Sequence, residues 1–245
     1  MKRVKLIVAY DGTNYCGWQI QPNGITIEGV LNEHLSRLLK EPIVVTGASR
    51  TDAGVHSMGN VAVFDTNARM PADKISYALN AGLPKDIVVQ DSCEVEQTFH
   101  PRKCQSIKTY EYSILNRKFK IPLYRFHTHF VHRPLNLERM KDAAVYLEGE
   151  HDFKSFCSIH TQARDTIRHI ISCDVEKEGD IITIRVKGYG FLYNMVRIIA
   201  GTLIQAGSLE IEPSDVEKIR NAKDREKAGP TAPAQGLTMI GIEYL

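Results

Sequence analysis

Cysteines are few in this sequence, and none has a spacing typical of a disulfide framework or a metal site. The sequence of 245 residues contains five cysteines, an odd number, and no two of them form a CxxC pair. This argues against a disulfide-stabilised fold and against a four-cysteine zinc site. Reduced thiols are typical of cytosolic proteins, so we expect a cytoplasmic protein.

Long apolar runs are also missing. No run reaches transmembrane length, and the apolar run near the N-terminus is too short for the core of a signal peptide. The sequence contains neither a GxxxxGK[ST] loop nor a GxGxxG turn, which phosphate-binding and dinucleotide-binding folds use. With 43% hydrophobic and 24% charged residues, the composition is that of an ordinary globular protein.

Acidic residues are scarce in one segment. The net charge is only +2, yet residues 100–125 hold seven Lys and Arg against one acid, Glu111, with aromatic residues interleaved. This composition is typical of a surface that contacts phosphates, although a solvated loop can have the same composition. The candidates for phosphate contact are Arg102, Lys103, Lys108, Arg117 and Lys118.

Strand-like and helix-like patterns alternate in both halves of the chain. Helices are expected at 26–40, 71–79, 136–147, 190–207 and 213–225. Strands are expected at 5–10, 43–45, 60–64, 87–95, 109–115, 169–176, 181–186 and 237–245. This mixture predicts an α+β fold with antiparallel sheet and two domains, 1–105 and 106–245.

The run Arg50-Thr51-Asp52-Ala53-Gly54-Val55-His56 places one carboxylate between a cation and a glycine. Gly54 permits a sharp turn between the predicted strands 43–45 and 60–64. A charged side chain on such a turn is a typical position for a functional group. A surface Arg–Asp pair with a local turn explains the run equally well.

Four segments, taken in order, carry a resemblance. They are Tyr10-Asp11-Gly12-Thr13 with Gly17-Trp18-Gln19; 49–56; Lys108-Thr109-Tyr110-Glu111-Tyr112; and 190–197, trailed by 232–237. Together they resemble the bacterial tRNA pseudouridine synthase A family over nearly the whole chain. Ser49, Ser57 and Gln235 stand where that family often has glycine, alanine and histidine.

The resemblance implies the pseudouridine synthase fold, with two ferredoxin-like (RRM-like), mixed, mostly antiparallel halves forming a central cleft. It also implies isomerisation of uridine at positions 38, 39 and 40 of the tRNA anticodon stem-loop by a homodimer that needs no cofactor. Asp52 matches the essential aspartate. Whether Asp52 attacks C1′, attacks C6 of the base or removes a sugar proton stays open.

Four further residues are expected at the substrate. Tyr110 matches the active-site tyrosine and can stack on an extruded base, although alternation along its strand fits a core tyrosine as well. Arg50 would fill the space that the base leaves or guide the base, and Leu192 would form an apolar wall. Arg197, a cation within an apolar run, needs an anionic partner, for which we expect Asp52.

His127, His129 and His132 are closely spaced, and the first two are expected on one strand face. No carboxylate pair accompanies them, so we expect no metal. Three functions are weighed: a tRNA pseudouridine synthase, a non-catalytic RNA-binding protein on the same scaffold, and a metal-dependent hydrolase using the histidines. The presence of Arg50, Asp52 and Tyr110 favours the enzyme.

Overall fold

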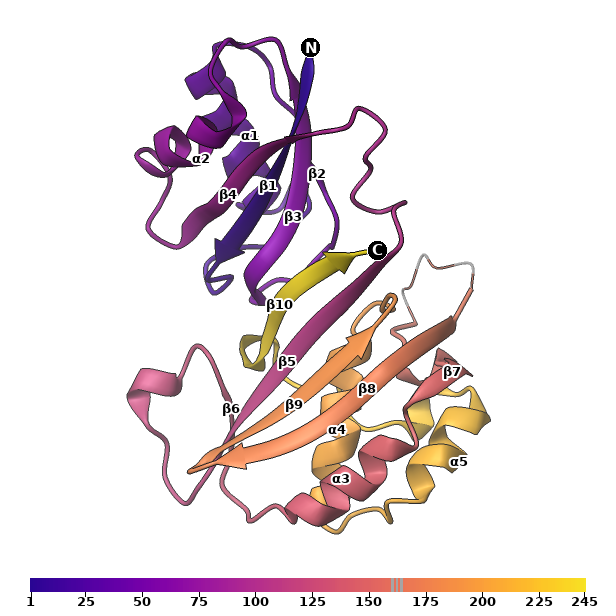
Figure 1. Cartoon of the computed structure of the whole chain (residues 1–245). Helices are drawn as coiled ribbons and strands as arrows, with labels where there is room; N and C mark the ends of the chain where they lie inside the picture. Colours follow the sequence, from indigo (N-terminus) through magenta and orange to yellow (C-terminus); the bar gives the residue numbers. More distant parts are fainter. Residues whose placement is uncertain (160, 162, 164) are drawn as a thin grey trace. The chain divides into compact units, whose positions relative to one another are not determined.

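The computed structural model describes residues 1–159, 161, 163 and 165–245, and it divides into two compact units. The first unit contains Met1–Ser106 together with Met239–Leu245, and the second contains Ile107–Thr238. Both mix helices with mostly antiparallel strands (Figure 1). The predicted α+β class is therefore confirmed.

The sheet of the first unit is built around its first strand. β1 (Lys2–Tyr10) pairs antiparallel with β3 (His56–Thr66) on one side and with β4 (Ile87–Val95) on the other. The short β2 (Thr46–Gly47) pairs with β3. β10 (Leu237–Tyr244), at the end of the chain, follows β3 in the strand order.

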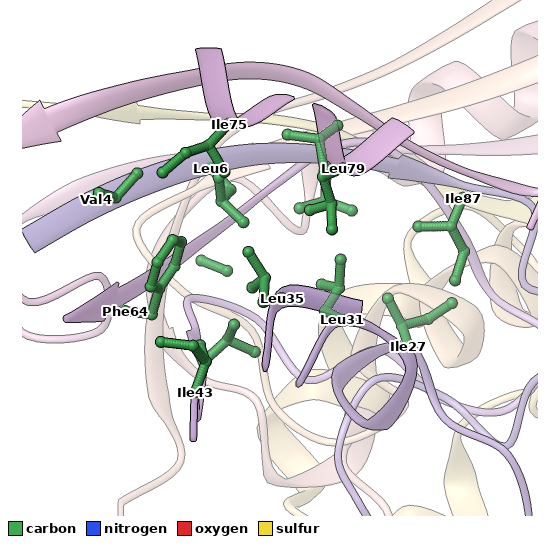
Figure 2. Packing of buried hydrophobic residues seen from close by; sticks show 14 of the residues in the cluster. Val4, Leu6, Ile27, Leu31, Leu35, Ile43, Phe64, Ile75, Leu79 and Ile87 are labelled. Carbon is green, nitrogen blue, oxygen red and sulfur yellow. The ribbon is translucent and has the colours of Figure 1, made fainter. Parts of the chain in front are cut away.

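Two helices complete the first unit, α1 (Ile27–Leu39) and α2 (Ala72–Asn80). Buried side chains alternate along β1, as a strand with one face in the core requires. Ile27, Leu31 and Leu35 recur every four residues and form the buried face of α1. Figure 2 shows these side chains directed toward Leu6 of β1 and Leu79 of α2.

The predicted start of the first helix is confirmed, because the Thr26 side chain accepts a hydrogen bond from Gly29 N. The strand predicted at 43–45 is wrong. There Val45 N donates to Asn32 Oδ1 and Ile43 N donates to Ser36 Oγ, so side chains of α1 satisfy the backbone. Burial alternates there as in a strand, but within the described residues no strand pairs with the segment.

The second unit contains an antiparallel hairpin, β8 (Ile167–Glu178) and β9 (Ile181–Gly188), flanked by β7 (Gly149–Asp152) and β5 (Ser106–Asn116). β6 (His129–Val131) runs parallel to β5. Three helices accompany this sheet, α3 (Leu137–Val145), α4 (Met195–Gly207) and α5 (Asp215–Ala222). Short 3-10 helices in the described part of this unit are η1 (Pro122–Tyr124), η2 (Lys154–Phe156), η3 (Arg225–Lys227) and η4 (Ala234–Gly236).

Two helices of the second unit are shorter than predicted. α4 begins at Met195 and not at 190, because Asn194 has a left-handed φ of 61° that no helix interior contains. α5 follows Ser214, which stands at the capping position but makes no capping side-chain hydrogen bond. The segment 190–194 is therefore a loop, so that Leu192 lies in this loop whereas Arg197 lies in the first turn of α4.

Candidate active site

The loop that carries Asp52 connects β2 to β3. Asp52 is half-buried and Arg50 is exposed. Val55 N donates to Asp52 O over 3.1 Å, which closes a tight turn, and Gly54 within it has a φ of 78°. The sharp turn predicted from Gly54 is confirmed. The carboxylate thus stands on a compact turn that leads directly into a buried strand.

The first of the four segments holds this loop by hydrogen bonds. Trp18 N donates to Thr51 O over 3.1 Å, and Gly54 N donates to Tyr15 O over 3.3 Å. The hydroxyl groups of Tyr10 and Thr51 are 2.8 Å apart and buried. The backbone on both sides of Asp52 is therefore fixed by residues 10–18. The sequence showed that these two segments occur together, but not that one supports the other.

Two glycines of the first segment permit this close approach. A Cβ at Gly17 would lie 2.5 Å from Thr51 O, and Gly17 has a φ of 82°. A Cβ at Gly12 would lie 2.0 Å from Val55 O. Both distances are far below van der Waals contact, so neither position accommodates a side chain. The glycines are required because the two loops meet backbone to backbone.

The other end of the loop is held by β3. The Asn60 side chain, fully buried, donates to Ser49 O over 3.0 Å and accepts from Ser49 N over 3.3 Å. His56, also buried, accepts a hydrogen bond from Gly12 N at Nδ1, which lies 3.1 Å from Asp11 Oδ1. Polar side chains at the start of β3 therefore fix both ends of the Asp52 loop.

In the second unit, Tyr110 lies in β5 opposite Val186 of β9 and is 8% exposed. Its ring meets the edge of Phe191, with centroids 5.1 Å apart. Tyr112 is fully buried and donates to Pro233 O over 2.9 Å, and burial raises the pKa of Tyr112 above its usual value. Tyr112 is therefore a core residue, whereas Tyr110 retains a small accessible surface.

Leu192 and Arg197 flank the start of α4. Leu192 is 6% exposed. Arg197 Nε donates to Ala232 O over 2.8 Å, one of its terminal nitrogens donates to Asn194 Oδ1 over 2.9 Å, and Ala232 N donates to Arg197 O over 3.1 Å. Two neutral oxygens thus orient the guanidinium within its own unit. Asp52 belongs to the first unit and Arg197 to the second, and their pairing stays a prediction.

The basic residues predicted to contact phosphates are divided between the units. Arg102 and Lys103 are exposed in the first unit, whereas Lys108, Arg117 and Lys118 belong to the second. Arg117 forms an ion pair with Asp180 over 3.1 Å. Their contact with phosphates stays a prediction, but Arg117 has a structural partner that the sequence did not reveal.

The three histidines differ in their surroundings. β6 contains His129 but begins after His127, so the predicted strand face shared by these two is wrong. His129 is half-buried with its ring edge toward Tyr112, at 6.2 Å between centroids, and burial lowers the pKa of His129. His127 and His132 are exposed.

Among the described residues, every helix is too short or too polar to cross a membrane. All five cysteines are free thiols. These observations define a class of protein. It is an α+β protein that holds one carboxylate, Asp52, on a loop whose backbone is fixed by hydrogen bonds.

The particular family follows from comparison with known proteins. The family model described as tRNA pseudouridine synthase matches residues 6–102 and 143–244. The tRNA pseudouridine synthase A of Thermoanaerobacter sp. (strain X514) is 48% identical over 244 residues, and that of Ruminiclostridium cellulolyticum is 48% identical over 245. The tRNA pseudouridine synthase A of Brevibacillus brevis is 45% identical over 244 residues, and 100% of both chains is covered in all three comparisons.

The chain belongs to the tRNA pseudouridine synthase family, whose members isomerise uridine to pseudouridine in tRNA. Arg50, Asp52, Leu192 and Arg197 lie within the matched ranges, and Tyr110 lies between them. A solved structure titled "Crystal Structure of a Cbf5-Nop10-Gar1 Complex" is 13% identical, with a TM-score of 0.33 over 96% of this chain and 56% of that one. A likeness this weak says nothing further about this chain.

Proposed function

We propose that this chain isomerises uridine to pseudouridine at positions 38, 39 and 40 of the tRNA anticodon stem-loop, with Asp52 as the essential nucleophile or base. The observation that carries the proposal is the Asp52 loop, whose backbone is hydrogen-bonded to Tyr15, Trp18 and its own turn. A reacting group must be held within a fraction of an ångström to act on a substrate. Full-length similarity to pseudouridine synthases supports the same assignment.

The reaction exchanges one bond for another. The bond from C1′ to N1 breaks, the base rotates, and a bond from C1′ to C5 forms, while C5 loses the proton that N1 gains. Because bonds and electrons balance, the isomerisation requires no oxidant and no ATP. A carboxylate attacks C1′ or C6, or removes a sugar proton, only in its ionised form. All three routes remain compatible with the proposed role of Asp52.

The target base must leave its stack before Asp52 can act on it. We assign substrate binding to Tyr110, Arg50, Leu192 and Arg197. In this proposal Tyr110, 8% exposed, stacks on the base, Leu192, 6% exposed, contacts it, and the exposed Arg50 fills the vacated space or guides the base. Arg197 offers a guanidinium oriented by Ala232 and Asn194.

The decisive experiment maps pseudouridine at nucleotide resolution in tRNA incubated with the wild type and with Asp52→Asn. The substitution keeps the shape of the side chain and removes its charge, so turnover should fall by at least about a thousandfold while tRNA still binds. Asp91→Asn, which neutralises an exposed aspartate of β4, is the matched control and should retain full activity. Pseudouridine formation by Asp52→Asn at the wild-type rate would refute the proposal.

We further propose a cytoplasmic homodimer. The free thiols are consistent with a reducing compartment. The dimer is an expectation from family resemblance, and the native mass in solution tests it directly. A mass of one chain at working concentration would exclude a stable dimer.

A further inference from the structure

Residues 117–133, here termed the basic arm, contain no acid at all. They connect β5 to the region before α3. The arm lies between the two ranges that the family model matches, 6–102 and 143–244. Its cations are Arg117, Lys118, Lys120, Arg125 and Arg133, and its aromatic residues are Phe119, Tyr124, Phe126 and Phe130. Such a composition is typical of surfaces that bind nucleic acids.

Hydrogen bonds hold together the two ends of the basic arm, where it leaves and rejoins the second unit. Asn116 at the end of β5 donates through its side-chain amide to Val131 O over 3.0 Å and to Arg133 O over 2.7 Å. The backbone N and hydroxyl of Thr128 both donate to Tyr124 O, over 3.0 and 2.9 Å. The two ends of the loop are thereby joined, and its tip contains η1. Figure 1 shows the loop standing out from the strands of the second unit.

The cations of the arm fall into two groups. Arg117 at one end pairs with Asp180, and Arg133 at the other end pairs with Glu210. These two arginines attach the arm to the body of the unit.

The three cations between these two arginines lie over aromatic rings instead of pairing with carboxylates. In the described part of the chain, Lys118, Lys120 and Arg125 have no carboxylate partner. Lys118 Nζ lies 5.2 Å from the ring centre of Phe119, and Lys120 Nζ lies 5.6 Å from that of Phe130. The Arg125 guanidinium lies 4.1 Å from the ring centre of Phe126. These three charges remain available to anions.

Large apolar side chains on the arm are unusually exposed. Phe119 is 66% exposed, Leu123 83%, Tyr124 42% and Phe126 41%. A cluster of exposed apolar residues on a fixed loop marks an interaction surface. Aromatic faces interleaved with cations fit unpaired nucleotides, whose bases stack on rings and whose phosphates contact the charges. A contact of the arm with its own copy across a two-fold axis fits less well, because it would place two basic, acid-free surfaces against each other.

We propose that the basic arm binds unpaired nucleotides of the tRNA. Lys118, Lys120 and Arg125 contact the phosphates, and Phe119 and Tyr124 stack on the bases. That the RNA is a tRNA rests on the proposed function. The binding chemistry rests on the arm alone.

The first test measures how RNA affinity depends on salt. All binding is measured on Asp52→Asn protein, so that turnover does not change the RNA. The probe is a synthetic anticodon stem-loop, and a blunt RNA duplex of the stem alone is the comparison. Replacing Lys118, Lys120 and Arg125 by Gln should lower the slope of log affinity against log salt by about 2 for the stem-loop. The matched control replaces the exposed Lys154, Lys177 and Lys227 by Gln and should leave the slope unchanged.

The second test separates stacking from charge. Phe119→Leu with Tyr124→Leu keeps apolar side chains but removes the aromatic faces. Affinity for the stem-loop should fall by about tenfold to a hundredfold, with an unchanged salt slope and unchanged affinity for the duplex. Tyr77→Leu is the matched control, because Tyr77 is 74% exposed in α2 and also lies near a lysine, Lys74 Nζ at 5.8 Å.

Two outcomes would overturn the inference. Stem-loop affinity that responds to the arm no more than to the controls would show that the arm contacts no RNA. Unchanged RNA affinity together with a lower native mass of the arm variants would assign the arm to an interface between copies. Arm-dependent binding by the Asp52→Asn protein, together with a wild-type protein that forms no pseudouridine in tRNA, would refute the proposed function and leave the arm's role standing.

Discussion

The Asp52 loop of the first unit and the Arg197 region of the second unit are fixed by different means. Around Asp52, the main chain of one loop meets the main chain of another, and Gly17 makes this possible. Around Arg197, side chains reach to main-chain oxygens, as in the bonds from Arg197 to Ala232 and from Tyr112 to Pro233. The first arrangement requires glycine where the two main chains meet, with the Asn60 and His56 side chains supporting the ends of the loop, whereas the second rests on particular side chains.

This difference explains which departures from the family pattern are tolerable. Ser49 stands where the family often has glycine, and both its backbone N and O are bonded to Asn60. Its hydroxyl is buried and has no hydrogen-bond partner in the part of the chain that is described. The loop therefore uses the backbone of residue 49 and not its side chain. We expect substitutions among small residues there to matter little.

The most damaging change to the first region should be Gly17→Ala. The added Cβ would meet Thr51 O at 2.5 Å, Asp52 C at 3.1 Å and Ala53 N at 3.2 Å, with φ already at 82°. We expect the free energy of unfolding to fall by about 2–4 kcal/mol from backbone strain and overpacking. Pseudouridine formation should fall by about a hundredfold or more, because Asp52 would be displaced.

Chemical denaturation and single-turnover kinetics measure both effects. The control is Gly241→Ala, since a Cβ at Gly241 meets nothing within 4 Å. If Gly17→Ala retained wild-type turnover, backbone contact between residues 17 and 51 would not be what positions the carboxylate.

In the second region, Arg197→Lys tests whether the fixed geometry of one side chain positions the site, as backbone contact does in the first region. A lysine cannot reproduce two bonds in fixed directions to Ala232 O and Asn194 Oδ1. We expect stability to fall by about 1–3 kcal/mol and turnover to fall by about tenfold to a hundredfold.

Arg139→Lys provides the matched control. Arg139 likewise donates to two neutral oxygens, Ala206 O over 3.1 Å and Ile211 O over 2.8 Å, but it lies in α3 and has no proposed substrate role. Its variant should lose similar stability and keep its turnover. Equal losses of turnover in both variants would make Arg197 merely structural.

The sequence predicted the elements well where one physical signal dominates. The bounds of β4 and the capping of α1 by Thr26 follow from local patterns. The segment 43–45 was misassigned because a strand pattern says which side chains are buried and not what the backbone pairs with. Asp52 could be found because its turn chemistry is local. The contacts of residues 10–18 with residue 51 join segments more than thirty positions apart, and no local pattern encodes such a contact.

The smallest effect that we expect concerns how stability depends on pH, and it is tested at one aspartate from each unit, Asp65 and Asp152. The hydrogen bond from Arg3 holds the pKa of Asp65 below its usual value, and that from Thr166, with help from Lys223, does the same for the pKa of Asp152. Because the folded pKa is the lower one, each carboxylate contributes stability above the ordinary aspartate pKa of about 3.9. This contribution is lost as the pH falls through the folded value.

Asp65→Asn and Asp152→Asn should each lower the melting temperature by about 1–3 °C near neutral pH, since both groups are partly exposed and screened. The difference from wild type should shrink to nothing as the pH falls to about 2. Calorimetry over that range measures it, with Asp91→Asn as the control. A deficit that persists undiminished in acid would mean that the lost contacts are packing and not charge. Turnover near neutral pH should be unaffected in both variants, because these two ion pairs lie outside the Asp52 loop and the Arg197 region.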